Sequence, residues 1–573
     1  MKTPNTKLQR DPSFQTSNAK TSVASKGSEQ FSTRMNTTNK EDEVSPELTT
    51  QIPANVNRRA FIIRNAVIGA AAVMTGRTWT PEARAQQAAK EAGPANPSLP
   101  PLDSTSMSPK LDVVKKSKGP VMTILEEFYK VGPGPSSSHT IGPMRITYDF
   151  YQRCQKLPAD QLGQATGLKV HLYGSLSATG KGHGTERASL AGLLGKEPAT
   201  VDPKFLDDMR ENPNQSYPLK LGNKNFNLSL KDVIYDSAKG DFPHPNTMTC
   251  KLMGGDKPIY ELEYYSPGGG FYEWKGYEPP KKGQPKYPYA SMKELRKHAE
   301  DNKLSVAQLM MANEVAVSGK SEEQINAFLD KIAKAMIATV KTGLSYKDDV
   351  LPGPIKLHSK AATVWERAQD DKYQTDKVIA QVSALALAAS EENARGHLVI
   401  TAPTGGSAGV MPAIVYALTQ GPRQMPMEKA REGLLAGAAI GYLCKHNATL
   451  SGAEGGCQSE IGVASGMSAA FIAQVMGGSP LIVENSAESA LEHHLGMTCD
   501  PVAGYVQVPC IERCAFGAVK AWIAAMIATN EIASRHRVDL DTTIKTLADT
   551  GRDMSTKYKE TSEAGLAANL VLC

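Results

Sequence analysis

The sequence predicts an α+β domain followed by an all-helical domain, and three observations support that prediction. Between residues 119 and 275, stretches that alternate like strands lie among stretches with helical spacing. From residue 290 to 573, strand patterns nearly vanish and long runs rich in Ala, Leu, Ile, Met and Glu dominate. Residues 276–289, rich in Pro, Gly and Lys, read as a linker between the two.

Composition places the chain among ordinary globular proteins. Of its 573 residues, 40% are hydrophobic and 21% are charged, and the length allows two or more domains. The formal charge is only +5, with no basic run interleaved with aromatic residues, so nucleic acid is not an expected partner. Eight cysteines at wide, irregular spacing predict free thiols or metal ligands and not a disulfide framework.

The N-terminal segment predicts export. Residues 1–57 are polar with almost no aromatic side chains, so we expect disorder. Residues 58–85 resemble a twin-arginine signal: Arg58 and Arg59 precede Phe61, a short apolar run follows, and a small-residue site ends at Ala85. The apolar run is too short to span a bilayer, so no stable membrane span is expected. Residues 86–118 then form a linker, and we expect the twin-arginine machinery to deliver the protein to the periplasm; the alternative is a cytoplasmic protein.

The domain at 119–275 contains a loop suited to a small anion. A helical pattern over residues 121–129 leads into GPSSSHTIGP, in which Ser136, Ser138, His139 and Thr140 crowd together before a helix that begins near Pro143. Hydroxyls and backbone N–H groups at a helix start can bind a carboxylate, while an imidazole can move a proton near neutral pH. Strands are predicted at 169–173 and 258–265, with His171 on the solvent face.

The domain at 290–573 is predicted from helical periodicity alone. A loop of small residues at 401–410 interrupts its helices. The predicted helices are 305–317, 322–342, 376–395, 428–444, 461–476, 484–496, 515–536 and 540–558.

Three cysteines of this domain stand in turn-like settings. Cys457, Cys499 and Cys510 are separated by 42 and then 11 residues. Thiolates suit iron–sulfur clusters, zinc and copper(I), but this spacing matches neither the paired CxxC of structural zinc sites nor the tight run of ferredoxins. By spacing alone, the favoured interpretation of each cysteine is a small buried hydrophobic residue.

The phrases around these residues are more specific. EGGCQSEIGVASGMSAA, EHHLGMTCDPVAGYVQVPCIER and GPSSSHTIGP together resemble the iron–sulfur L-serine dehydratases (L-serine ammonia-lyases) of the bacterial single-chain type. The resemblance runs from about Val121 to the last residue. It implies a lyase that converts L-serine to pyruvate and ammonia, with a helical domain that binds a [4Fe–4S] cluster. A homodimer is expected only because it is the commonest symmetric assembly of soluble proteins. A cluster assembled in the reducing cytoplasm agrees with export of an already folded protein.

The resemblance also assigns roles to residues. Cys457, Cys499 and Cys510 are the implied cluster ligands, and the C-terminal Cys573 is the implied ligand of the remaining iron in the resting state. His139 is the implied general base, with Ser136, Ser138 and Thr140 gripping the substrate's carboxylate or amine. His183, in a GKGHGT phrase, with His244 and Asn246 in an HPNT phrase, are further candidates.

The sequence departs from the family in three places, and the function keeps competing interpretations. Gly405 and Ala408 stand where the family usually has Asn and Cys, and His494 where it usually has Asn, which leaves the fit of the substrate open. A lyase acting on another β-hydroxy amino or organic acid therefore stays open, as does an exported amino-acid-binding homologue without turnover. A pyridoxal-phosphate dehydratase would need a Schiff-base lysine in a recognisable phrase, and the sequence offers none.

Overall fold

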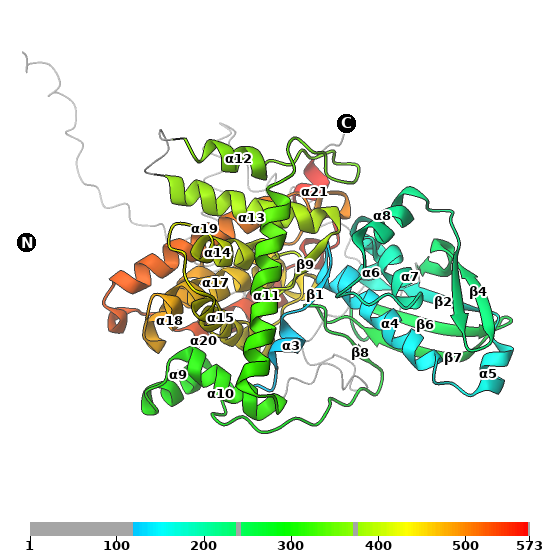
Figure 1. Cartoon of the computed structure of the whole chain (residues 1–573), viewed down its shortest axis with the longest axis horizontal. Coiled ribbons are helices and arrows are strands. Elements are labelled where there is room, and N and C mark those ends of the chain that lie inside the picture. The colour runs from blue at the N-terminus through cyan, green and yellow to red at the C-terminus, as the bar shows by residue number, and fades with distance from the viewer. Residues whose placement is uncertain (1–118, 237–241, 371–375, 571–573) are drawn as a thin grey trace, which may run out of the picture. The chain divides into compact units, whose positions relative to one another are not determined.

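A five-stranded mixed sheet forms the centre of the N-terminal domain (Figure 1). Its strand order is β5 (Val233–Tyr235), β2 (Gly167–Leu172), β6 (Thr247–Gly254), β7 (Lys257–Tyr265) and β8 (Glu273–Trp274). β2 and β5 run parallel, and every other neighbouring pair is antiparallel. The computed structural model describes residues 119–236, 242–370 and 376–570; the predicted segments 1–57, 58–85 and 86–118, together with Cys573, lie outside these residues.

Helices pack on this sheet because its buried positions alternate. In β2, Leu168, Val170 and Leu172 are buried while the intervening residues are half-exposed, as expected for a strand with one covered face. The helices α4 (Gly142–Cys154), α6 (Gly174–His183) and α7 (Thr185–Leu193) contact the strands of this sheet. The domain is completed by α5 (Ala159–Gln164), α8 (Pro203–Glu211) and the hairpin of β3 (Tyr217–Leu221) and β4 (Lys224–Leu228).

The C-terminal domain surrounds one helix that is buried along its whole length. Every residue of α17 (Ile461–Val475) is buried, which its apolar sequence on all sides predicts. The helices α14 (Val410–Thr419), α15 (Met427–Asn447), α18 (Pro480–Glu492) and α19 (Cys510–Asn530) pack around it. Farther out lie α9 (Met292–Asp301), α10 (Val306–Ser318), α11 (Glu322–Gly343), α12 (Ala361–Arg367), α13 (Lys377–Arg395) and α20 (Leu540–Asp553).

The expected fold class is confirmed, with shifts at some helix ends. α18 begins at residue 480, earlier than the predicted 484, because Ser479 caps it through the N–H of Ile482 and Pro480 occupies its first turn. α19 begins at Cys510 and ends at Asn530, against a predicted 515–536, so Cys510 lies on the first turn of a helix and not in a loop. The short α9, α12 and α14 were not predicted.

One strand pair joins the two predicted domains. β1 (Val131–Pro133) pairs antiparallel with β9 (Leu398–Ile400), the one strand in the otherwise helical C-terminal domain as described. Just before β1, α3 (Leu125–Phe128) packs into the core of the helical domain, and the hydroxyl of Tyr129 donates to the carbonyl of Leu434 over 2.8 Å. The loop after β1 is thereby held against the loop after β9.

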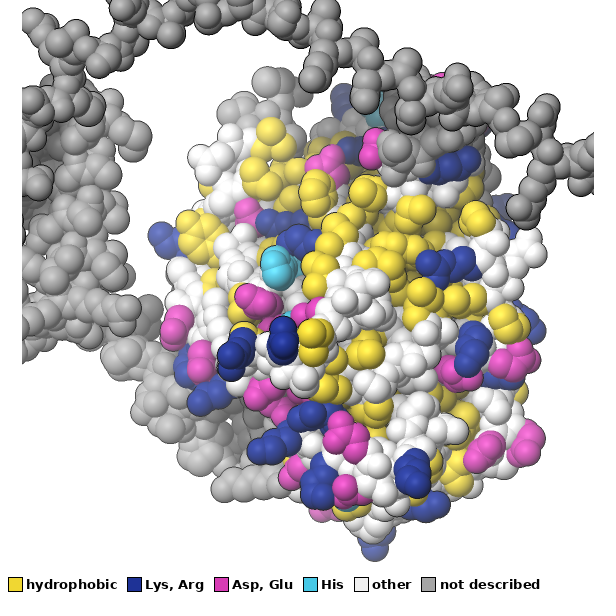
Figure 2. All heavy atoms as spheres, turned by 90° about the vertical axis from the view of Figure 1, so that its left-hand side faces the viewer, with side chains coloured by type: hydrophobic (Ala, Val, Ile, Leu, Met, Phe, Trp, Pro, Cys, Tyr) yellow, Lys and Arg dark blue, Asp and Glu magenta, His cyan; other side chains and the backbone are white. Residues whose placement is uncertain are grey.

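The surface shows two further features. In the described part of the chain, no helix combines the length and apolar character needed to cross a bilayer. Figure 2 shows a face on which apolar side chains lie among charged ones. On α19, Phe516, Ile523 and Ile527 are exposed.

Candidate active site

The loop after β1 forms a tight turn that gathers the predicted hydroxyls. Residues Ser137–Ile141 make one turn of π-helix that continues into α4, and Ser136 caps it by accepting the N–H of His139 over 3.1 Å. The loop packs closely against α13 at Gly134. Any Cβ at this position would lie 2.1 Å from the carbonyl oxygen of Asn393, so only glycine fits there. The hydroxyl of Thr140 donates to the carbonyl of His183 over 2.8 Å and is therefore engaged within the protein.

His139 is fully buried, and both of its ring nitrogens contact serine hydroxyls. Nδ1 lies 2.8 Å from Oγ of Ser138, and Nε2 lies 3.1 Å from Oγ of Ser175 at the start of α6. The hydroxyl of Ser175 donates its single proton to the carbonyl of Glu560 over 3.4 Å. With its proton so directed, Ser175 accepts from His139, an arrangement that assigns the imidazole proton to Nε2 and the lone pair to Nδ1.

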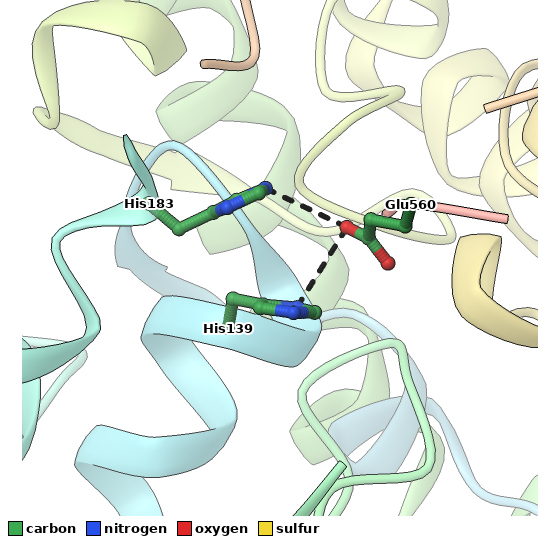
Figure 3. Close-up of side chains that lie close together, drawn as sticks. All are labelled: His139, His183 and Glu560. Carbon is green, nitrogen blue, oxygen red and sulfur yellow. Dashed lines mark ion pairs between the residues drawn. The ribbon is translucent and has the colours of Figure 1, made fainter. Parts of the chain in front are cut away.

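A carboxylate that the sequence did not suggest lies between the two histidines. Oε1 of Glu560 is 3.7 Å from Nδ1 of His139 and 3.5 Å from Nε2 of His183 (Figure 3). All three side chains are buried, and the two imidazole rings lie 4.6 Å apart between centroids. Glu560 and Ser175 were missed. A lone acid in a polar C-terminal stretch predicts an exposed loop, and the serine lacked any local motif of its own.

Glu560 reaches the site because the C-terminal segment is tied to the segment around Cys499. The N–H of Cys499 donates to the carbonyl of Tyr558, and the N–H of Glu560 donates to the carbonyl of Cys499, each over 2.7 Å. Farther on, the N–H of Leu566 donates to Oδ2 of Asp500 over 2.5 Å. The segment thus follows the Cys499 loop and presents Glu560 inward with a left-handed φ of 60°.

Burial controls the protonation of these groups. It lowers the pKa of His183 to about 4 and lowers the pKa of His139 well below its usual value, so both imidazoles are neutral at pH 7. Their contacts with Glu560 are therefore not ion pairs at that pH. Burial, and then the nearby Cys457, raises the pKa of Glu560 to about 8. Burial, and then Glu560, raises the pKa of Glu460 to about 8. A cation bound beside these carboxyls would lower both values.

The three predicted cysteine ligands come together from three segments. Cys457 opens a 3₁₀ turn just before α17, Cys499 lies in the loop after α18, and Cys510 begins α19; all are buried. The thiols of Cys457 and Cys499 and a carboxylate oxygen of Glu460 all lie within 4.8 Å of one another. Cys510 is close enough to Cys457 for the two thiols to interact electrostatically.

These thiols suit a cationic iron–sulfur group. The hydrogen bond with Cys457 and then burial raise the pKa of Cys499, and burial and then Cys457 raise that of Cys510, both well above the usual value. Several buried thiolates therefore need a positive centre among them. Arg513 interacts electrostatically with all three cysteines, while its guanidinium donates to the carbonyl of Thr498 over 2.5 Å.

The other described cysteines are free thiols with different surroundings. Cys514 donates to the carbonyl of Gly406 over 3.3 Å, and burial raises its pKa to about 12. Cys154 and Cys250 lie in the core of the α+β domain, and Cys444 lies in the helical core. Cys573 lies outside the described residues.

His244 and Asn246 connect the α+β domain to the first cysteine phrase. Nε2 of His244 lies 3.2 Å from Oε1 of Glu454, three residues before Cys457. Nδ1 of His244 accepts the N–H of Asn246 over 2.9 Å, and the side-chain amide of Asn246 donates to the carbonyl of Ser266. Ser266 in turn donates through its hydroxyl to the carbonyl of Ser138 over 2.7 Å. His244 and Asn246 therefore support the His139 loop through Ser266.

The three residues that differ from the family's usual ones, Gly405, Ala408 and His494, lie in two different places. A Cβ on Gly405 would lie 2.7 Å from the backbone nitrogen of Ser137, so the His139 loop packs directly on this glycine. Ala408 is buried in the same loop. His494 is buried beside Gly462 of α17 and donates from Nδ1 to the carbonyl of Ala490 over 2.6 Å; burial lowers its pKa to about 4.

A cavity of about 350 Å³ adjoins the site. Its lining includes Pro135 and Gly182, the immediate neighbours of Ser136 and His183, together with Tyr505 and Gln507 from the loop before Cys510. Lys181 and Arg210 also line it. The cavity thus reaches Pro135, next to the His139 loop, from the junction of the two domains.

Comparison with known proteins agrees with this arrangement. A family model described as "Serine dehydratase beta chain" matches residues 125–276, and one described as "Serine dehydratase alpha chain" matches residues 301–567. The "L-serine dehydratase 2" of Escherichia coli (strain K12) is 41% identical over 457 residues, covering 78% of this chain and 99% of the relative. The "L-serine dehydratase" of Haemophilus influenzae is 40% identical over 454 residues, covering 78% and 98%. That of Streptomyces coelicolor is 40% identical over 455 residues, covering 78% and 99%.

Both matched regions carry the site described above, since His139, His183 and His244 fall in the beta-chain region and the three cysteines and Glu560 in the alpha-chain region. The chain therefore belongs to the L-serine dehydratase family, in the form that joins a beta-chain and an alpha-chain domain in one polypeptide.

Proposed function

We propose that this chain holds a [4Fe–4S] cluster on Cys457, Cys499 and Cys510 and uses it as an L-serine ammonia-lyase. As a member of its family, the chain converts L-serine to pyruvate and ammonia, and the family implies an iron–sulfur cofactor. The observation that carries the proposal is the convergence of three buried thiols, two of which interact electrostatically with the same Glu560 that contacts the buried, neutral His139. A four-iron cluster with three cysteine ligands supplies one open iron, a Lewis acid that assists departure of the β-hydroxyl.

The residues of the chain supply the proton transfer and the grip on the substrate. Nδ1 of His139 carries the lone pair that takes the α-proton, and burial keeps the ring neutral and ready to accept it. The hydroxyls of Ser136 and Ser138, 3.3 Å apart at the start of a helical turn, bind the substrate's carboxylate. Burial of the whole turn excludes water from the site. Loss of water leaves aminoacrylate, which tautomerises and hydrolyses to pyruvate and ammonia.

Anaerobic purification followed by three measurements tests this proposal. Iron and acid-labile sulfide should be present in about equal amounts at four per chain, and L-serine should yield pyruvate and ammonia in equal amounts. L-threonine assayed in parallel separates serine specificity from a broader lyase acting on β-hydroxy acids. A protein that binds L-serine and holds iron yet forms no pyruvate would instead be the non-catalytic binding homologue. A protein without iron would overturn the cluster.

Export and self-association are further proposals. The twin-arginine pattern at Arg58 and Arg59 supports passage through the twin-arginine machinery to the periplasm after the cluster has been inserted. A homodimer is the commonest symmetric assembly and is the expected state of this chain. Sedimentation equilibrium of the anaerobic protein would give its mass directly, and a monomer at micromolar concentration would overturn the dimer.

A further inference from the structure

Three groups face one another next to the His139 loop, and all three are hydrogen-bond acceptors once the Glu560 carboxyl is ionised. They are Nδ1 of His139, Nε2 of His183 and a carboxyl oxygen of Glu560, all within 4.8 Å of one another. The side chains of the three residues are buried, so water in bulk does not reach them. Acceptors that converge in a buried place need a donor or a cation among them.

The tautomer of His183 follows from its own helix. Nδ1 lies 2.8 Å from the carbonyl oxygen of Thr179, and only a protonated Nδ1 can bond to a carbonyl. Nε2 is therefore a lone-pair acceptor, and it has no hydrogen-bond partner among the described residues. Oε2 of Glu560 likewise has no partner in the described part of the chain. Figure 3 shows the ring of His183 pointing Nε2 toward the carboxyl group of Glu560.

The third acceptor differs from the other two. Nδ1 of His139 already receives the hydroxyl of Ser138 over 2.8 Å, whereas Nε2 of His183 and Oε2 of Glu560 receive nothing from the described residues. Two open acceptors are fewer than the three or four protein ligands that hold a metal ion in a stable site. They are well matched to a group with several N–H donors and a positive charge.

We propose that Nε2 of His183 and the carboxylate of Glu560 form the receptor for the α-ammonium group of L-serine. This inference rests on the proposed function, because L-serine is the molecule that brings an ammonium group to this place. Two of its three N–H bonds point to His183 and Glu560. The α-carbon, one bond away, then lies beside Nδ1 of His139, which is freed when the hydroxyl of Ser138 turns from that nitrogen to the substrate's carboxylate.

The proposal gives the C-terminal segment a role in choosing the substrate. Hydroxy acids without an amino group would present the same hydroxyl and carboxylate, but they would leave His183 and Glu560 unpaired in a buried place. A site built to pair a charged donor rejects an analogue that lacks it, since the buried acceptors then lose their partner. Glu560 and His183 are therefore residues that determine specificity for amino acids over hydroxy acids.

The test compares L-serine with 3-hydroxypropanoate, which has the hydroxyl and the carboxylate but no amino group. The cluster-loaded enzyme and its Glu560→Gln variant are assayed anaerobically for the KM of L-serine and for the inhibition constant of 3-hydroxypropanoate. If the variant does not turn over, the Kd of L-serine is measured calorimetrically in place of KM. We expect L-serine to bind about 10- to 100-fold more weakly in the variant, while the constant for 3-hydroxypropanoate stays within about twofold.

Two further variants complete the test. Asp236→Asn makes the same change to a carboxylate that lies 3.2 Å from a histidine, His171, outside the site, and it should alter neither constant. If Glu560→Gln fails to assemble, as shown by its iron and sulfide content, Glu560→Asp carries the comparison. It keeps the charge but withdraws it by one methylene, and L-serine alone should again bind more weakly.

Several results would overturn the proposal. Equal weakening of both ligands would show that Glu560 only supports the loop, and an unchanged affinity for L-serine would show that the ammonium group binds elsewhere. A divalent metal present beyond the cluster iron in the wild type and lost in Glu560→Gln would make the three residues a metal site. Failure of the wild type to form pyruvate would refute the proposed function itself, which is a different result from any of these.

Discussion

Replacing Ser175 by alanine should switch the tautomer of His139, the proposed general base. The hydroxyl of Ser175 accepts the Nε2 proton of His139 over 3.1 Å and passes its own proton to the carbonyl of Glu560. Without it, a buried N–H would lack an acceptor, at a cost of about 1–3 kcal/mol. The neutral ring would instead carry its proton on Nδ1, where Ser138 can accept it, and the lone pair would face away from the substrate.

The magnitude follows from that cost. A penalty of about 1–3 kcal/mol shifts the tautomer ratio by roughly 5- to 150-fold, and kcat should fall by a similar factor because only the ring with a free Nδ1 takes the α-proton. KM should stay within about twofold, since Ser175 is not among the groups proposed to bind the substrate. A structural disturbance of the site would alter KM and iron content as well.

The pH profile gives a second, independent reading. Activity requires neutral His139, so it is lost as pH falls through the pKa of that group. Burial lowers this pKa well below its usual value, and a hydrogen bond with the backbone of Ser175 partly opposes the effect. Ser175→Ala keeps that backbone group, so the acid limb of kcat/KM should stay in place while kcat falls. Ser175→Thr should restore kcat, and Ser177→Ala, on the same helix, should leave it unchanged. An unaltered kcat in Ser175→Ala would refute the assignment of Nδ1 as the base.

Three further outcomes are expected. Cys457→Ala, Cys499→Ala and Cys510→Ala should each lose both iron and pyruvate formation. The matched controls, which should keep most of both, are changes to alanine at Cys514, Cys154, Cys250 and Cys444. If one of the first three variants keeps full iron and turnover, that cysteine is not a cluster ligand. Arg58 and Arg59 changed to Lys should leave the protein in the cytoplasm, and an uncut wild type found only there by fractionation would contradict export. Cys573→Ala should abolish any lag or sigmoidal response to L-serine, because the thiolate of Cys573, tethered to the chain, would compete with the substrate. The same change should quicken the loss of iron in air. Unchanged kinetics and unchanged air stability would mean that Cys573 has no such role.

Periodicity predicted the long helices because their apolar residues repeat over many turns. The helix at 461–476 was found within one residue as α17, and 322–342 as α11. Short elements such as α12 and β9 were missed because their few residues gain their stability from packing and not from a local pattern. Helix starts moved where a capping serine and a proline act together, as at Ser479 and Pro480.

The site, too, has residues that the sequence predicted and residues that it could not predict. Its loops could be found because Ser136 to Thr140 and the cysteine phrases are distinctive strings of residues. Glu560 and Ser175 could not be found, because they reach the site only through contacts between segments that are far apart in the sequence. One lies 385 positions from the other along the chain, and their contact exists only when the C-terminal segment follows the Cys499 loop. Which ring nitrogen of His139 carries the proton likewise depends on partners from separate segments, namely Ser138, Ser175 and, through Ser175, Glu560.

The course of the C-terminal segment has a consequence for how the site could be lost. Tyr558 and Glu560 exchange backbone hydrogen bonds with Cys499, and the N–H of Leu566 donates to Asp500. The same segment carries Glu560 to the two histidines. A local opening that detached residues 558–566 would therefore withdraw Glu560 and loosen the Cys499 loop in one step, so the two halves of the site share one local stability.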